Sequence, residues 1–192
     1  MMLRSFIAIE IPAKIQGAIA ESTAGLRTAL PRPMVRWVLP QNVHLTLKFL
    51  GDASPANLEM LAQAIKTEAS QHLAFSISIG GLGVFPNPKR PRVIWIGVEA
   101  PAELQSLQRG IEAAAARLGY APENRSFSPH LTIGRVNQNV SMAEAQKIRA
   151  ALEQTHVGAL GTTMVDAIHI FKSDLQPAGA VYTLLYAAQF RK

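Results

Sequence analysis

The sequence contains no cysteine, few charged residues and no long hydrophobic run. Without cysteine, disulfide bonds, thiolate metal sites and a thiolate nucleophile are all excluded. No stretch reaches the roughly 18 consecutive apolar residues that a membrane-spanning helix requires. The first residues also lack the long apolar segment of a secretory signal peptide. We therefore expect a cytoplasmic protein that makes no contact with membranes.

Charged residues make up only 17% of the 192 residues, whereas 48% are hydrophobic. This balance is typical of a globular protein with a sizeable core. Lys and Arg outnumber Asp and Glu by 19 to 13, which gives a formal net charge of +6. An excess of positive charge favours a polyanionic partner such as nucleic acid. The densest basic cluster is Lys89, Arg90 and Arg92, which either binds such a partner or forms only a solvated turn.

Histidine is scarce, with five residues in the chain, and yet one histidine pattern occurs twice. "HLTL" begins at His44 and "HLTI" begins at His130. Composition alone would place two such patterns in about one chain in seven hundred. A single histidine in a strand is more often structural than catalytic. Its repetition therefore indicates a functional pair.

The repeat extends beyond the two histidine motifs. "IEIPAKIQ" at Ile9–Gln16 resembles "VEAPAELQ" at Val98–Gln105, and the histidine motifs lie 86 residues apart. Internal similarity at about half the chain length indicates duplication. We predict one bilobal domain over 1–192, with repeat halves of approximately 1–90 and 91–192.

The order of expected elements supports this duplication. Apolar alternation and capping signals predict β-α-β-α-β in each half. Helices are expected over 13–29, 54–71, 102–118 and 141–155, and strands over 5–11, 43–50, 75–85, 91–98, 129–136, 163–172 and 180–190. The short "PNPKRP" and "SDLQPAG" segments suggest hairpin turns. The predicted fold is α+β, with two pseudo-symmetric lobes, mainly antiparallel sheets facing a central cleft, and helices outside.

Strand geometry places the two motifs in comparable settings, because alternate residues of a strand share a face. His44, Thr46 and Lys48 are expected on one face of the first strand, with Leu45, Leu47 and Phe49 on the other. His130 and Thr132 share a face of the second strand. Related by a pseudo-two-fold axis, the two strands would present two imidazoles and two hydroxyls to one cleft.

Arg135 lies three residues after Thr132, so strict alternation would point it into the core. A β-bulge at Gly134 would return it to the cleft. Contact with phosphate or RNA and a salt bridge at the rim are both open for Arg135. Phe85, Trp37 and Tyr182 are candidates for stacking on a base, although core packing is the more common role of such residues.

Two opposed histidines suit in-line displacement at phosphorus. One neutral imidazole can take a proton from water while the other, protonated, gives a proton to the leaving group. The threonine hydroxyls can donate hydrogen bonds to phosphate oxygens as charge develops. Metal-dependent hydrolysis is disfavoured because the sequence has no HxH or HExxH pattern. A serine nucleophile is also unsupported, since there is no GxSxG motif.

The paired "HLTL" and "HLTI" resemble the HxTx motifs of the 2H phosphoesterases. Their surroundings resemble the RNA 2′,3′-cyclic phosphodiesterase branch, the LigT-like "2′-5′ RNA ligases". The similarity covers nearly the full length, through "RWVLPQNVHLTLKFLG", "GVFPNPKRPRVIWIGV", "FSPHLTIGR" and "IFKSDLQPAGAVYTLL".

The resemblance implies His44 as proton donor, His130 as proton acceptor, and Thr46 and Thr132 as phosphate binders. It further implies a two-lobed fold with a central cleft, no metal or other cofactor, and hydrolysis of an RNA 2′,3′-cyclic phosphate to a 2′-phosphate. Arg135 also matches the usual surroundings of the second motif.

Two other functions stay open at this point. The same site could join RNA ends through a 2′-5′ linkage, which is the reverse chemistry. The fold could also serve as an RNA- or nucleotide-binding module with little turnover, although binding alone would not need both histidines. The expected partners are RNA with 2′,3′-cyclic phosphate ends or related cyclic nucleotides, and we expect a monomer.

Overall fold

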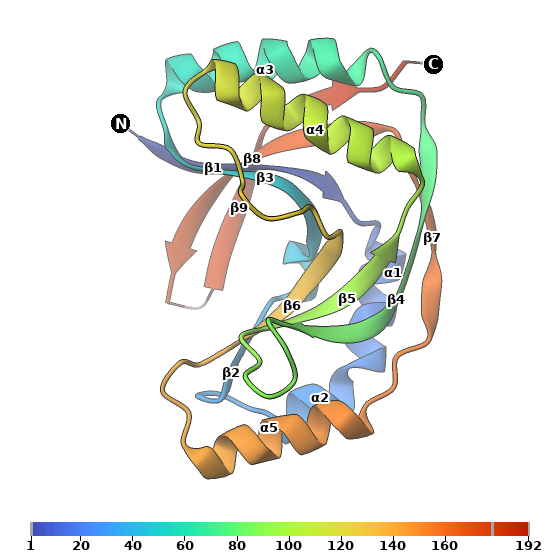
Figure 1. Cartoon of the computed structure of the whole chain (residues 1–192), viewed down its shortest axis with the longest axis vertical. Helices are drawn as coiled ribbons and strands as arrows, with labels where there is room; N and C mark the ends of the chain where they lie inside the picture. Colours follow the sequence, from blue (N-terminus) through green and yellow to red (C-terminus); the bar gives the residue numbers. More distant parts are fainter. Residues whose placement is uncertain (1, 178, 192) are drawn as a thin grey trace.

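The computed structural model describes residues 2–177 and 179–191. Five α-helices, one short 3-10 helix and nine strands follow one another along this part of the chain (Figure 1). In chain order they are β1 (Leu3–Glu10), α1 (Ala13–Ser22), α2 (Ala24–Ala29), β2 (Val35–Trp37), η1 (Pro40–Asn42), β3 (His44–Ala53), α3 (Pro55–Ala69), β4 (Phe75–Phe85), β5 (Val93–Glu99), α4 (Ala102–Arg117), β6 (His130–Val136), α5 (Met142–Gln154), β7 (Ala159–Val165), β8 (Ala167–Gln176) and β9 (Gly179–Gln189).

The strands form one curled sheet in the order β7-β4-β5-β6-β3-β1-β8-β9, and β2 pairs with β6. Every pairing between named strands is antiparallel. At the centre, β3 and β6 pair only through Leu45 and Leu131. This narrow junction divides the sheet into two half-sheets of four main strands each. The α+β fold and the antiparallel sheet predicted from the sequence are confirmed.

Each half-sheet carries its own helices. The first lobe packs α3 and α4 on β3-β1-β8-β9, and the second packs α1, α2 and α5 on β6-β5-β4-β7 (Figure 1). The lobes are therefore not the two halves of the sequence. Helix α1 and strand β4 belong to the first half but lie in the second lobe. Helix α4 and strands β8 and β9 belong to the second half but lie in the first lobe.

Capping explains where the longer helices begin. The Ser54 hydroxyl accepts a hydrogen bond from the Asn57 amide, and Pro55 occupies the first helical position of α3. Ser141 and Glu144 form a complete capping box at the start of α5. Both starts agree with the sequence signals.

Three local features differ from the expectations. The helix expected over 13–29 is broken at Thr23, whose hydroxyl bonds to the Ile19 carbonyl. The strand expected over 163–172 is two strands, because the chain leaves the β4 edge after β7 and joins β1 as β8. Asp166 stands between them, and its carbonyl accepts from the Phe190 amide. Strand β2 has only three residues, which is too short for apolar alternation to predict it from the sequence.

Apolar side chains from both lobes form one continuous buried cluster. Leu45 and Leu131 are fully buried at the junction between the half-sheets, beside the fully buried Ile96 and Ile133. Burying a side chain of this size stabilises a fold by about 1.5–3 kcal/mol. The junction is therefore held by packing beneath the sheet rather than by many strand hydrogen bonds.

The prediction that Lys48 shares a face with His44 is wrong. Ala8 pairs with Thr46 but Ile7 pairs with Lys48, so one residue of β3 bulges between them and the alternation reverses. Phe49 consequently turns outward and is 63% exposed.

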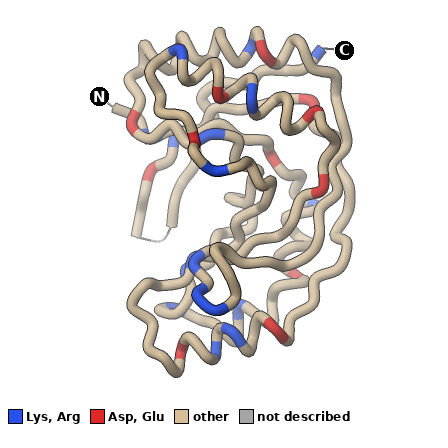
Figure 2. Tube along the Cα trace, viewed as in Figure 1, with Lys and Arg blue, Asp and Glu red and all other residues tan. Residues whose placement is uncertain are grey.

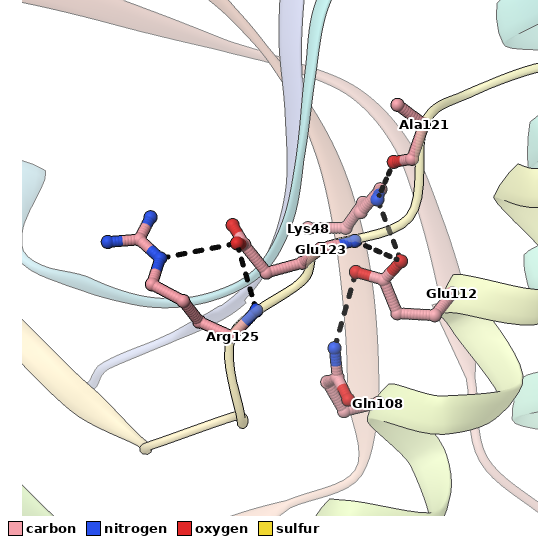
Figure 3. A network of polar contacts seen from close by, with 6 residues as sticks. All are labelled: Lys48, Gln108, Glu112, Ala121, Glu123 and Arg125. Atoms are coloured by element: carbon pink, nitrogen blue, oxygen red, sulfur yellow. Dashed lines mark hydrogen bonds and ion pairs between the residues drawn. The ribbon is translucent and has the colours of Figure 1, made fainter.

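Lys48 instead enters a polar network beneath α4 (Figure 3). Its ammonium donates to Glu112 Oε2 at 2.7 Å and to the Ala121 carbonyl at 2.6 Å. The Glu123 amide donates to the same carboxylate oxygen, and Glu123 in turn pairs with Arg125. Lys48 thus ties β3 to the segment that leads into β6.

Within the described residues, no helix is both long enough and apolar enough to cross a bilayer.

Candidate active site

The two HxT motifs lie side by side at the centre of the sheet. Strand β3 begins at His44, β6 begins at His130, and Leu45 pairs with Leu131. Extending this antiparallel register by one residue each way sets His44 across from Thr132, and Thr46 across from His130. All four side chains then share the face opposite the buried leucines. In such a lattice directly opposite β carbons lie about 5 Å apart, and the two histidines occupy diagonal positions about 7 Å apart.

His44 is held by its backbone partner and by aromatic rings. Its Nδ1 donates to the Asn42 carbonyl at 2.7 Å. Because a carbonyl can only accept, this bond places the proton on Nδ1 and leaves Nε2 to meet a substrate. The Phe6 ring stacks on the imidazole at 4.6 Å, and Tyr182 meets it edge-on at 5.2 Å.

His130 repeats this arrangement in the second lobe. Its Nδ1 donates to the Ser128 carbonyl at 2.7 Å, again two residues before the histidine. The Phe85 ring meets the imidazole edge-on at 4.9 Å, and Trp95 lies at 6.3 Å between ring centroids. Both histidines therefore carry the same tautomer and keep Nε2 free of the backbone.

The electrostatic setting of His44 keeps its imidazole neutral. Burial lowers the pKa of His44 from 6.5 to about 4. The hydrogen bond to Asn42 opposes this shift, and the positive charge of Arg135 adds to it. At neutral pH the free protein therefore presents His44 without a charge.

Two cavities meet at His44. One, of about 550 Å³, is lined by His44, Thr46, Thr132 and Arg135. The other, of about 700 Å³, also reaches His44 and extends past Glu10 to His169. Tyr182 lines both cavities, so it stands with His44 at the boundary between them.

Arg135 reaches the cleft through a β-bulge, which lies one residue before the Gly134 position expected from the sequence. Ile94 pairs with Gly134 but Trp95 pairs with Thr132, so Ile133 is the extra residue. The bulge restores Arg135 to the histidine face, where its side chain is exposed and lines the smaller cavity. A β carbon at Gly134 would lie only 2.9 Å from the Trp37 ring, so a larger residue here would force that ring to move.

Sequence reasoning missed two arginines in the same cavity. Arg36 pairs with Arg135 across β2 and β6, and Arg4 comes from β1. Arg36 opens the segment "RWVLPQNVHLTLKFLG" but lies outside the HxT motif, and Arg4 lies outside all the segments quoted above. In the structure Arg4 lies two residues before Phe6, the ring that packs on His44, but the sequence alone gives no sign of that contact.

The three aromatic candidates have different roles. Tyr182 and Phe85 pack against the two histidines. Trp37 lines the smaller cavity, donates from Nε1 to the Leu30 carbonyl and lies beneath the Arg27 guanidinium. The cluster of Lys89, Arg90 and Arg92 occupies the exposed β4–β5 loop, which carries basic residues in Figure 2. Those three residues line neither cavity.

Over residues 2–177 and 179–191, no group of three or more His, Asp or Glu side chains is placed to hold a metal ion. The smaller cavity gathers the His44 imidazole, the two threonine hydroxyls and the Arg135 guanidinium, and the strand register places the His130 imidazole on the same face although it lines neither cavity. This set is suited to an anionic group, because it offers hydrogen-bond donors and positive charge but no carboxylate.

The sequence profile described as "LigT like Phosphoesterase" matches the chain twice, over residues 9–95 and 96–182. The chain belongs to this family. The two tandem matches also confirm the internal duplication and the predicted membership of the 2H phosphoesterases.

Among the relatives of this LigT-like chain are proteins named "RNA 2′,3′-cyclic phosphodiesterase". The one from Methanothermobacter thermautotrophicus is 33% identical over 183 residues, covering 95% of this chain and 96% of the relative. The one from Aquifex aeolicus is 35% identical over 154 residues, covering 79% and 80%. Among solved structures, the Thermus thermophilus protein TT0787 aligns with a TM-score of 0.80 at 26% identity over 98% of each chain. Escherichia coli LigT in complex with 3′-AMP aligns with a TM-score of 0.74 at 26% identity over the whole of both chains.

Proposed function

We propose that this protein hydrolyses RNA 2′,3′-cyclic phosphodiester ends to 2′-phosphomonoesters without a metal ion. The observation that carries the proposal is the pair of HxT motifs on adjacent strands, each with its imidazole Nε2 directed away from the backbone bond at Nδ1. The names of the relatives point to the same substrate.

The reaction requires a base on one side of phosphorus and an acid on the other. We assign the base to His130, whose Nε2 takes a proton from the attacking water. The bond from phosphorus to the 3′ oxygen breaks, and the His44 Nε2–H protonates that oxygen. The water oxygen stays on phosphorus, and the phosphate remains on the 2′ oxygen. Thr46 and Thr132 donate hydrogen bonds to the non-bridging oxygens as their negative charge increases.

The pKa of His44 adds a condition to this assignment. Its imidazole is neutral in the free protein at pH 7, whereas an acid must carry a proton. A bound cyclic phosphate brings a negative charge that offsets the charge of Arg135 and raises the pKa of His44. Substrate binding and proton uptake by His44 are therefore coupled.

Arg135 is proposed to bind the substrate phosphate. It lines the same cavity as both threonines, and its charge is close enough to act on His44. A guanidinium in this position stabilises the added negative charge of the transition state.

The test is to incubate the purified, EDTA-treated protein with a nucleoside 2′,3′-cyclic phosphate and identify the product. We expect turnover that survives chelation and yields the 2′-phosphate. Loss of activity in EDTA, with recovery on adding zinc or manganese, would contradict the metal-independent mechanism. A 2′-5′-linked product from RNA ends would assign ligation to the site, and binding without turnover would reduce it to a binding module.

A further inference from the structure

The two cavities that meet at His44 carry opposite charge. The smaller one, here named the arginine groove, is lined by Arg4, Arg36 and Arg135, and none of the described residues that line it is acidic. The larger one, here named the carboxylate pocket, is lined by Glu10 and Asp166, and none of its described lining residues is Lys or Arg. A chain of phosphates leaving the catalytic centre therefore meets attraction on one side and repulsion on the other.

The three arginines line one groove and, among the described residues, form no close ion pair, although Asp52 lies across from Arg4 in the β1–β3 pair. Arg36 lies across from Arg135 in the β2–β6 pair, and none of the three takes part in an ion pair within the described part of the chain. Their charges all act on Tyr182: burial raises the pKa of its hydroxyl, and the three guanidinium groups oppose that rise. Three like charges held around one hydroxyl repel each other, and an anion in the groove would remove that repulsion.

The groove also offers apolar surface to bases. Phe49, turned outward by the bulge in β3, is 63% exposed, and Leu175 near the tip of the β8–β9 hairpin is 67% exposed. Positive charge beside exposed aromatic surface is the combination that binds single-stranded nucleic acid, because phosphates pair with the cations and bases stack on the rings.

We infer that the arginine groove binds the phosphodiester backbone on the 5′ side of the terminal nucleotide, so that the preferred substrate is an oligonucleotide rather than a mononucleotide. This inference rests on the proposed function. An RNA that ends in a 2′,3′-cyclic phosphate has no phosphate beyond that end, so all its other phosphates lie on the 5′ side. Only the arginine groove can accept them without repulsion. Arg4 and Arg36 contact these upstream phosphates, whereas Arg135 serves the cyclic phosphate itself.

The experiment compares the double variant Arg4→Gln/Arg36→Gln with the wild type on two substrates. One is a nucleoside 2′,3′-cyclic phosphate, and the other is a six-nucleotide RNA that ends in the same cyclic nucleotide. The measured quantity is the ratio of the two kcat/KM values. We expect the wild type to prefer the RNA. In the variant the ratio of the two kcat/KM values should fall by about 10–100-fold. Losing two phosphate contacts should also flatten the dependence of log KM on log salt for the RNA by about 1.4.

The matched control is Lys66→Gln/Arg117→Gln, which removes the same charge from exposed positions on α3 and α4. This control should keep both the ratio and the salt slope. An unchanged ratio and slope in Arg4→Gln/Arg36→Gln would overturn the inference. If the RNA chain passed through the carboxylate pocket instead, Glu10→Gln/Asp166→Asn would raise the preference for RNA. Arg4→Gln/Arg36→Gln would then leave that preference unchanged.

The outcomes separate the two proposals. A wild type that turns over neither substrate defeats the proposed function. A wild type that hydrolyses both substrates, with no preference that depends on Arg4 and Arg36, defeats only the arginine groove.

Discussion

His44 and His130 occupy equivalent places in the two lobes but differ in their surroundings. Each donates Nδ1–H to a carbonyl two residues earlier, and each meets an aromatic ring edge-on. His44 is additionally covered by the stacked Phe6 ring, and burial lowers its pKa to about 4. At His130 the second ring, corresponding to Phe6, is that of Trp95, and its centroid lies 6.3 Å from that of the imidazole.

The comparison separates what the local sequence determines at each histidine from what packing by distant strands determines. The HxT motif and the carbonyl before it fix the tautomer, so the same short sequence gives the same orientation twice. The packing of rings from distant strands sets how closely each imidazole is covered, and here the lobes differ. Duplication therefore supplied two similar groups, and the aromatic surroundings made them unequal.

The largest effect is expected from removing either imidazole. His44→Ala and His130→Ala should each lower kcat by about 10²–10⁴ on a nucleoside 2′,3′-cyclic phosphate, because one proton transfer is lost in each. A substrate with a good leaving group needs no acid, so it should largely restore the activity of His44→Ala but not that of His130→Ala. Rescue of His130→Ala instead would reverse the two roles.

The two threonines should respond more mildly and more equally. Thr46→Ala and Thr132→Ala are each expected to lower kcat by about 10–10³, since each removes one hydrogen bond that strengthens in the transition state. Thr→Ser keeps the hydroxyl and is the control in each lobe. A loss in KM alone, with kcat preserved, would show that the hydroxyls bind substrate and transition state equally.

Acid should destabilise the fold partly through His44. Because its folded pKa lies below the unfolded value of about 6.5, the unfolded state binds the extra proton, and the free energy of unfolding falls as pH drops from about 6.5 to 4. The contribution of this one group is at most about 3 kcal/mol. Urea titrations at successive pH values measure the free energy of unfolding. In His44→Asn, this part of its decrease with falling pH should be absent. His156→Asn, on the exposed segment after α5, is the control. Equal pH dependence in all three proteins would contradict the low pKa of His44.

The smallest effect is a shift of that pKa when one ring is removed. Tyr182→Ala opens the cover of His44 to water, so the pKa of His44 should rise from about 4 by one unit or more towards 6.5. Phe85→Ala removes the matching ring beside His130 and should leave the pKa of His44 in place. Titration of the His44 ring by NMR measures both. A similar shift in the two variants would mean that the rings do not act locally.

Local signals carried much of the fold and the main candidate residues. Ser54 and Ser141 mark helix starts through bonds within four residues, and the alternation around His44 and His130 identifies a buried face. Information of this kind is present in a short window of sequence. The four HxT residues were accessible for the same reason.

Features that depend on distant partners could not be predicted in this way. The bulge that turns Lys48 inward exists because β3 must match the register of β1 and because Glu112 on α4 offers a partly buried carboxylate. Arg36 reaches the groove only through its pairing with β6. Asp166 divides one apolar stretch between the two half-sheets, and nothing local distinguishes that crossing from a continuous strand.

The exchange of α1, β4, α4, β8 and β9 between the sequence halves and the lobes has a consequence for unfolding. Neither lobe can be assembled from one continuous half of the chain, and the buried cluster runs through both. Because each lobe contains elements from both halves of the chain, unfolding of one lobe would remove packing partners of the other. The two lobes should therefore unfold together in a single cooperative transition.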